Sequence, residues 1–192
     1  MPDAIVINGI NDMRRAVLTL VGAAALAGGN APAIASDKSW DHASTVVRDI
    51  LVAVSLGAPV VQGDWNGALQ SAGSMGAAKL ITVGLKESFP EMRPDGSNDK
   101  SFPSGHTSIS FAAAASLQNR YGWKVGIPAQ LAAAFVGVAR VKADKHHWYD
   151  VLAGAAIGEA TGFLITNRRN DQVQVFPWGG SKGGGVTIAM RF

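Results

Sequence analysis

Five segments of helical length, rich in alanine, glycine and serine, constrain the fold of this chain more than any other feature. Apolar residues make up 47% of the 192 residues, whereas aromatic residues make up only 7%. Small side chains let neighbouring helices pack closely, and this length is enough for one domain with a core. We therefore predict an all-α helical bundle in which the helices cover residues 41–61, 65–86, 106–120, 127–140 and 148–167.

Turn residues and alternation place the other elements. The segment 87–105 contains three prolines and is the main predicted loop, and Pro128 suits the first turn of the fourth helix. After the last helix, "QVQVF" (172–176) and "GVTIAMRF" (185–192) alternate around a glycine-rich stretch, which predicts a short C-terminal β-hairpin. That stretch lacks the spacing of a nucleotide-binding loop.

The N-terminus has the layout of a secretory signal peptide. Arg14 and Arg15 precede an apolar run over 16–27, and the small-x-small stretch 33–35 follows. Met13 then becomes the expected start, and the alternative is a first core helix. The predicted division of the chain is an extension with signal peptide (1–35), a helical core (36–170) and a hairpin tail (171–192).

Net charge and hydropathy limit the classes of partner and the cellular location that we expect for this chain. A formal net charge of +3 without a long run of lysine or arginine argues against nucleic acid as a partner. A membrane span needs about 20 mostly apolar residues, and no segment meets this cleanly. The uncharged stretches 50–63 and 125–139 are short, and 151–166 carries Glu159. We expect an exported periplasmic protein; the alternative is an inner-membrane bundle whose site faces the periplasm.

Cationic side chains and a helix start suggest a site for phosphate. Arginine binds two oxyanion oxygens through its rigid fork, and lysine adds a point charge; the candidates are Lys86, Arg93 and Arg140. Ser104 and Gly105 open the third helix, where backbone N–H groups form an anion site. Such a cradle stabilises the charge that spreads over the oxygens in phosphoryl transfer.

Two histidines and a carboxylate complete a mechanism. His146 and Asp150 are four residues apart, so on a helical turn they share one face. A carboxylate bonded to one imidazole nitrogen fixes the tautomer and leaves the other nitrogen free to attack. We expect His106 on the opposite side of the phosphate cradle, where it can protonate the leaving oxygen.

These residues form three motifs in order. They are "KESFPEMRP" (86–94), "PSGH" (103–106) and "ARVKADKHHWYD" (139–150). The set resembles the three-part pattern of the type 2 phosphatidic acid phosphatase and vanadium haloperoxidase superfamily. Ala139 stands where that pattern usually has serine, a departure we expect to be minor. The resemblance implies a helical bundle with the site at one end and a phosphatase that needs no cofactor or metal.

The resemblance also implies roles. His146 resembles the family's nucleophile, His106 its general acid and Asp150 its orienting carboxylate. The residues that resemble the family's phosphate ligands are Lys86, Arg93, Ser104, Gly105 and Arg140. The implied reaction is hydrolysis of phosphate monoesters or pyrophosphates, of lipids above all, through a phosphohistidine. The alternatives are a vanadium-dependent haloperoxidase and a non-catalytic envelope protein.

Other polar residues have plainer interpretations. His147 competes with its neighbour, but the i,i+4 spacing favours His146, so we expect a wall or supporting role for His147. A metal site is disfavoured, because the predicted phosphate-binding cations would repel the ion; its ligands would be His106, His146, His147 and Asp150. His42 is expected at the surface. Lys142 and Lys145 are expected in solvent, and the alternative is that they widen the funnel for anions near the site.

Overall fold

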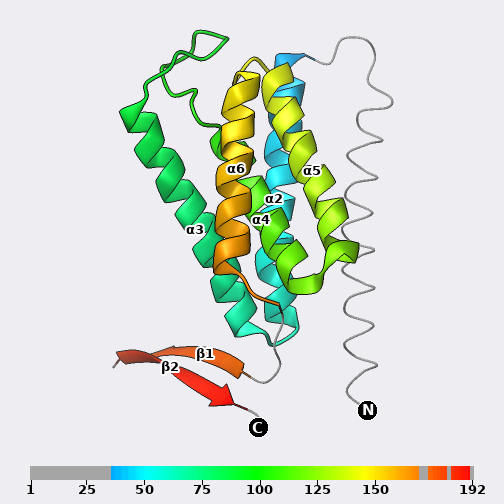
Figure 1. Ribbon diagram of the computed structural model, residues 1–192, viewed down its shortest axis with the longest axis vertical. Coiled ribbons are helices and arrows are strands. Elements are labelled where there is room, and N and C mark those ends of the chain that lie inside the picture. The colour runs from blue at the N-terminus through cyan, green and yellow to red at the C-terminus, as the bar shows by residue number, and fades with distance from the viewer. Residues whose placement is uncertain (1–35, 169–172, 181–182, 191–192) are drawn as a thin grey trace.

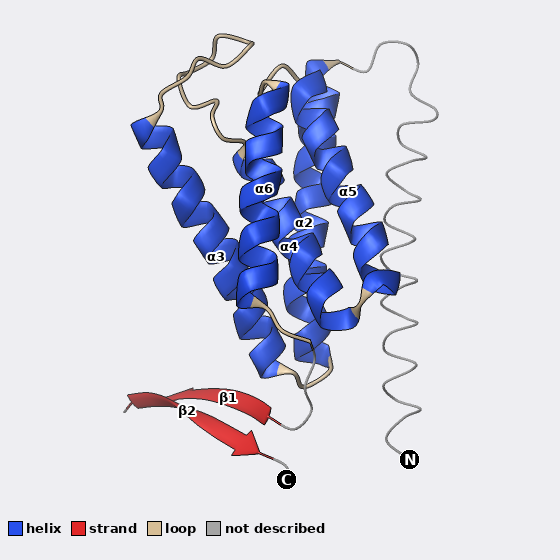
Figure 2. Cartoon of the chain, in the orientation of Figure 1, coloured by secondary structure: helices blue, strands red, loops and turns tan. Residues whose placement is uncertain are grey.

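The computed structural model describes residues 36–168, 173–180 and 183–190. Helices run side by side to form a bundle, and a small two-stranded sheet lies beyond one end of it (Figures 1 and 2). This confirms the all-α bundle with a C-terminal hairpin. The helices are α2 (Asp37–Val61), α3 (Trp65–Ser88), α4 (Gly105–Tyr121), α5 (Trp123–Lys142) and α6 (Trp148–Ile165).

The fourth predicted helix begins earlier than expected. Gly122, with φ 81°, ends α4, and α5 starts at Trp123, so Pro128 lies inside the helix and not in its first turn. A proline at the sixth helical position has no N–H to offer the Lys124 carbonyl, which costs the helix one backbone bond. The predicted start at 127 was wrong, because Gly122 is both the C-cap of α4 and the N-cap of α5.

Glycines on α6 let it pack tightly against α4, the helix at the centre of the bundle. A Cβ added at Gly154, Gly158 or Gly162 would lie 2.6, 2.4 and 2.3 Å from atoms of the segment 104–115. These three residues recur every fourth position and therefore share one face of α6. Glycine is required there because any side chain would separate the two helices.

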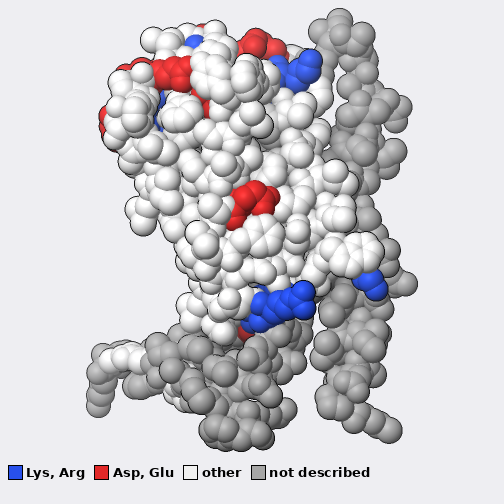
Figure 3. Space-filling view, in the orientation of Figure 1, with Lys and Arg blue, Asp and Glu red and all other residues white. Residues whose placement is uncertain are grey.

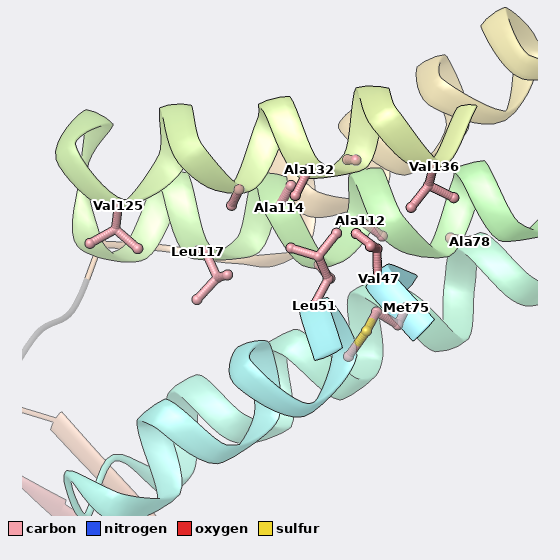
Figure 4. Packing of buried hydrophobic residues seen from close by; sticks show 13 residues of the cluster. Val47, Leu51, Met75, Ala78, Ala112, Ala114, Leu117, Val125, Ala132 and Val136 are labelled. Atoms are coloured by element: carbon pink, nitrogen blue, oxygen red, sulfur yellow. The ribbon is translucent and has the colours of Figure 1, made fainter. Parts of the chain in front are cut away.

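The core consists mainly of alanine and valine with two leucines and a methionine (Figure 4). Leu51 from α2, Met75 from α3 and Leu117 from α4 are its larger members, and all three are nearly or fully buried. Each comes from a different helix, so the cluster ties α2, α3 and α4 together. The alanine-rich stretch 112–115 is fully buried between its neighbours.

A buried ion pair fixes the end of the bundle away from the N-terminus of α4. Arg120 donates through Nε to Oδ2 of Asp64 at 2.6 Å, and the guanidinium also reaches Gln70 and the Asn167 carbonyl. Asp64 caps the first turn of α3 by accepting from the Gly67 N–H at 2.9 Å. The end of α4 is therefore joined to the start of α3 and to the segment after α6.

Two helices, α2 and α5, are long and apolar enough to cross a membrane by length and composition. This differs from the expectation that no segment would qualify, because both helices extend beyond the uncharged stretches considered in the sequence. On the face seen in Figure 3, charged side chains gather toward the two ends of the bundle, and the broad area between them is uncharged except for one acidic patch. Exposed apolar side chains of the helices include Leu80, Leu131 and Leu164.

The hairpin consists of β1 (Val173–Gly180) and β2 (Gly183–Met190), which pair antiparallel with Val175 opposite Ile188. Both strands extend further into the glycine-rich stretch than predicted. The predicted signal peptide in 1–35 lies outside the described residues, so that part of the domain division stays a prediction.

Candidate active site

The three sequence motifs meet at one end of the bundle, uppermost in Figure 1. There α3 and α5 end, α4 and α6 begin, and the loop 89–104 folds over them. A cavity of about 430 Å³ opens at this end. Six predicted site residues line it, namely Lys86, Arg93, Gly105, His106, Arg140 and His146. Ser104 and Asp150 are buried behind the wall of the cavity.

Lys86 occupies the last turn of α3 and is held by the loop. Its Nζ donates to the carbonyls of Lys100 at 2.7 Å and Ser101 at 3.1 Å. Burial, followed by the charge of Arg93, lowers the pKa of Lys86 to about 8. The ammonium is therefore cationic at neutral pH, but it is close to its titration range.

Arg93 lies in the loop, and backbone bonds shape the turn around it. Its N–H donates to the Asn98 carbonyl at 2.9 Å, and its own carbonyl accepts from Gly96, a glycine with φ 69°. Next to it, Asp95 binds the Lys145 ammonium at 2.6 Å, which joins the first motif to the third. Lys145, expected in solvent, thus lines the cavity with its charge compensated.

Ser104 anchors the start of α4 to the start of α6. Its N–H donates to the Asp150 carbonyl at 3.0 Å, and its hydroxyl pairs with Thr107 Oγ1 at 2.9 Å. The structure therefore does not bring this hydroxyl to the cavity, whereas Gly105 does line it. The backbone of the helix start remains available to an anion.

His146 is 2% exposed, and its Nδ1 lies 3.4 Å from Oδ2 of Asp150. The same Oδ2 accepts from the Ser101 hydroxyl at 2.5 Å and from the His147 N–H at 2.9 Å. Burial, followed by the charges of Arg140 and Lys86, lowers the pKa of His146 to about 2. The imidazole is neutral at neutral pH, so it retains a lone pair.

His106 faces α2. Its Nε2 accepts from Arg48 Nη1 at 2.8 Å and lies 3.2 Å from Thr45 Oγ1. Burial, followed by the charges of Arg140 and Arg48, lowers the pKa of His106 to about 3. This histidine is therefore neutral at neutral pH, and its Nε2 is an acceptor.

Arg140 is 3% exposed and is paired from the side of α2. Its Nη1 forms an ion pair with Asp41 and reaches the Ser44 hydroxyl at 3.3 Å. Its Nε has no hydrogen-bond partner among the described residues. Asp41 thus orients the guanidinium, and the Nε–H of Arg140 remains available to donate to an anion.

Glu91, His147 and Asp150 form a cluster beside the cavity whose ligand atoms lie within 4.8 Å of one another. His147 Nδ1 is 3.4 Å from Glu91 Oε1 and 3.5 Å from Asp150 Oδ2, and its ring stacks on Tyr149. A proton on Nδ1 can satisfy these contacts. His147 also caps α6, since its N–H bonds to Asp150.

Sequence reasoning missed several residues of the site. Asp41, Thr45 and Arg48 come from α2, far from any motif in the sequence, and Lys79 lies within an apolar stretch of α3. Ser101 stands two residues before the second motif, and its bond to Asp150 depends on how the loop folds. In the sequence, the only signal for a role of α2 is the presence of charged residues such as Asp41, Arg48 and Asp49 in a mainly apolar segment.

A comparison with protein families tests the resemblance that the three motifs suggested. The sequence profile described as the PAP2 superfamily matches residues 67–174. The chain belongs to the PAP2 superfamily. The match includes all three motifs and the helices α3 to α6, whereas α2 lies outside it. This confirms the family predicted from the motifs.

Curated relatives of this PAP2 chain are named as lipid phosphatases. The lipid A 1-phosphatase of Porphyromonas gingivalis is 39% identical over 88 residues, which are 44% of this chain and 20% of that protein. The lipid A 4'-phosphatase of Helicobacter pylori is 30% identical over 111 residues, 50% of this chain and 56% of that one. Lipid phosphate phosphatase 2 of Arabidopsis thaliana is 44% identical over 73 residues, 31% and 25% of the two chains. The matches thus span between a fifth and somewhat over half of these relatives.

A solved structure has the same fold. The crystal structure of Aquifex aeolicus LpxE superposes with a TM-score of 0.57 at 21% identity, over 67% of this chain and 83% of that one. The helical bundle described above is therefore the same fold as that of Aquifex aeolicus LpxE.

Proposed function

We propose that this chain is a phosphatase that hydrolyses lipid phosphate monoesters or diphosphates through a phosphohistidine on His146. The observation that carries the proposal is the position of this neutral, buried imidazole. It lies against Asp150 on one side and opens on a cavity that also holds Lys86, Arg93 and Arg140. A nucleophile and three cations around one space are what transfer of a phosphoryl group requires.

In the first step, Nε2 of His146 attacks the phosphorus of a bound phosphate, and the bond from phosphorus to the leaving oxygen breaks. Asp150 stabilises the positive charge on the imidazole, because its Oδ2 lies 3.4 Å from Nδ1. The three cations and the N–H groups at the start of α4 neutralise the charge that spreads over the phosphoryl oxygens. The leaving oxygen is protonated by His106 once the phosphate charge has raised its proton affinity.

In the second step, water attacks the phosphorus and the N–P bond breaks. His106, again neutral, accepts the proton of the attacking water, and orthophosphate leaves. His106 thus serves as acid and then as base, which one imidazole can do when its proton is lost and regained within a cycle. For this to occur the Arg48 fork must release Nε2, to which its Nη1 donates at 2.8 Å.

The lipid class rests on the names of the relatives and on the surface of the bundle. The relatives are named for lipid A and lipid phosphates, and α2 and α5 are candidate spans. Exposed apolar side chains such as Leu80, Leu131 and Leu164 suit contact with lipid. The proposal therefore places the protein at a membrane of the bacterial envelope, with the site facing the periplasm. Association of the whole bundle with the membrane replaces the soluble form that we favoured from the sequence.

Turnover is proposed to be independent of metal. The cavity contains the cations Lys86, Arg93 and Arg140, which perform the charge neutralisation that a metal performs in other phosphatases. The carboxylates nearest to it already have partners, since Asp41 binds Arg140 and Asp150 binds Ser101.

The test is phosphate release by the full chain in detergent with excess EDTA. The substrates are p-nitrophenyl phosphate and a dispersed phosphatidate, and the variants are His146→Ala and His42→Ala, an exposed histidine outside the site. We expect turnover in the wild type and in His42→Ala, and a loss of at least about a thousandfold in His146→Ala. Turnover that requires added metal, or that survives in His146→Ala, would contradict the proposal. Bromide oxidation with vanadate and peroxide would instead support the haloperoxidase alternative.

A further inference from the structure

The cavity contains two cations that belong to none of the three motifs and that neutralise no phosphoryl charge in the proposed mechanism for a monoester. Arg48 comes from α2, which lies outside the residues matched by the family profile, and Lys79 comes from the middle of α3. Lys145, another cation of the cavity, lies within the third motif and is already paired with Asp95 at 2.6 Å. Arg48 and Lys79 are therefore the cations whose purpose is unexplained.

Both lie on the same side of the phosphate cradle. Lys79 precedes Lys86 by seven residues on α3, about 10 Å along the helix. Arg48 follows Asp41, the partner of Arg140, by the same distance on α2. Because α3 ends and α2 begins at the site, both cations lie further into the bundle than the cradle. The lining of the cavity thus comprises the cradle, His106 and a second cationic region formed by Arg48 and Lys79.

The charges in this second region are compensated unequally, because Arg48 forms an ion pair with the exposed Asp49 at 2.7 Å and Lys79 is in none of the ion pairs of the described residues. Arg48 binds Asp49 through Nε and Nη2, but it directs Nη1 at the neutral His106. Lys79 is exposed, and no ion pair or hydrogen bond is recorded for it within the described part of the chain. A region with excess positive charge at the wall of a cavity attracts an anion.

The position of Arg48 indicates which part of a substrate would meet it. His106 is the group that faces the leaving oxygen, and Arg48 Nη1 lies 2.8 Å from its Nε2. The atoms beyond the leaving oxygen would therefore approach the Arg48 fork. A phosphate monoester of a lipid alcohol has a neutral leaving group, whereas a diphosphate leaves as an anionic lipid monophosphate.

We propose that Arg48 and Lys79 form a second anion subsite, which binds the inner phosphate of a lipid diphosphate and makes this class the preferred substrate. This inference rests on the proposed function. His146 Nε2 attacks the outer phosphorus, and the bond from that phosphorus to the bridging oxygen breaks. The bridging oxygen departs on the lipid monophosphate as an oxyanion, and the two cations neutralise it. Such a leaving group needs no proton, which agrees with a His106 that burial, Arg140 and Arg48 together keep neutral.

The test compares two substrates that differ by one phosphate, farnesyl diphosphate and farnesyl phosphate, on the full chain in detergent. We expect the wild type to have the higher kcat/KM on the diphosphate. Lys79→Met should lower the ratio of the two kcat/KM values about tenfold, the loss expected for one hydrogen bond to a charged group. The matched control is Lys124→Met, since Lys124 is an exposed lysine at the other end of the bundle.

The outcomes distinguish a failure of the proposed function from a failure of the second anion subsite. A wild type that hydrolyses neither compound would overturn the proposed function and this inference with it. A wild type that hydrolyses both, but whose ratio is the same in Lys79→Met, would overturn the subsite alone. A preference for the monophosphate would do the same.

Inhibition gives a second measurement that does not depend on the leaving group. Inorganic pyrophosphate should inhibit p-nitrophenyl phosphate hydrolysis at lower concentration than orthophosphate does. Lys79→Met should remove most of that difference, and Lys124→Met should retain it. Equal inhibition by the two anions in the wild type would contradict a second subsite.

Discussion

The hydroxyl of Ser101 donates to Oδ2 of Asp150 at 2.5 Å, and the same oxygen lies 3.4 Å from Nδ1 of His146. Both residues of the hydrogen bond are fully buried. The loop that contains Ser101 therefore fixes the carboxylate that orients the proposed nucleophile. This relationship joins the segment before the second motif to the end of the third.

Ser101→Ala should lower kcat roughly tenfold with little change in KM, because the carboxylate loses an orienting partner while the phosphate ligands remain. The measurement is steady-state hydrolysis of p-nitrophenyl phosphate. Ser97→Ala, in the exposed part of the same loop, is the control. Ser101→Thr retains a hydroxyl and should recover part of the rate. An unchanged kcat in Ser101→Ala would contradict the positioning role.

The pH dependence of kcat/KM should have an alkaline limb near pH 8. The pKa of Lys86 is lowered to about 8 by burial and by Arg93, so the ammonium is present below that pH and lost above it. Because kcat/KM reports ionisations of the free enzyme, the loss of this cation should appear there. Lys86→Arg stays charged and should move the limb to higher pH. A limb at the same pH in both proteins would assign it to another group.

Gly158→Ala should destabilise the bundle by about 1–3 kcal/mol, the range for overpacking. The new Cβ would lie 2.4 Å from the Ser108 carbonyl, so α6 must move away from α4. Gly57→Ala is a matched change on α2, where nothing lies within 4 Å of the added atom, and it should be neutral or slightly stabilising. Thermal unfolding in detergent measures both. Equal melting temperatures for the two variants would contradict the close packing of α4 and α6.

Arg120→Met should destabilise the fold by about 3–5 kcal/mol, because it leaves the largely buried Asp64 without its partner. The same unfolding experiment applies. Replacing both partners, with Arg120→Met and Asp64→Leu, should cost less than the single change, since no unpaired charge is then buried. A double variant that is less stable than Arg120→Met would argue against this explanation.

The helices and the motif residues could be predicted from the sequence, because both depend on local patterns. Apolar stretches on either side of the proline-rich loop 87–105 mark the helices, and fixed spacing marks Lys86, His106 and His146. The start of α5 was missed because Pro128 is tolerated inside the helix.

The contribution of α2 to the site could not be predicted. Asp41 and Arg48 look like isolated charges in the sequence, and their partners Arg140 and His106 lie 99 and 58 residues away. Only the packing of α2 against the bundle brings them to the cavity. The hydroxyl of Ser104 shows the reverse case, since the motif predicts a phosphate ligand and the structure pairs this hydroxyl with Thr107.

The most direct test of the central claim is to trap the intermediate. The full chain would be mixed with farnesyl diphosphate or p-nitrophenyl phosphate for milliseconds, quenched in alkali to preserve phosphohistidine, and digested for mass spectrometry. The account predicts one added phosphoryl group on the peptide that contains His146, and none in His146→Ala. A wild type that turns over without any phosphorylated peptide, or with the group on His106 or His147, would contradict it.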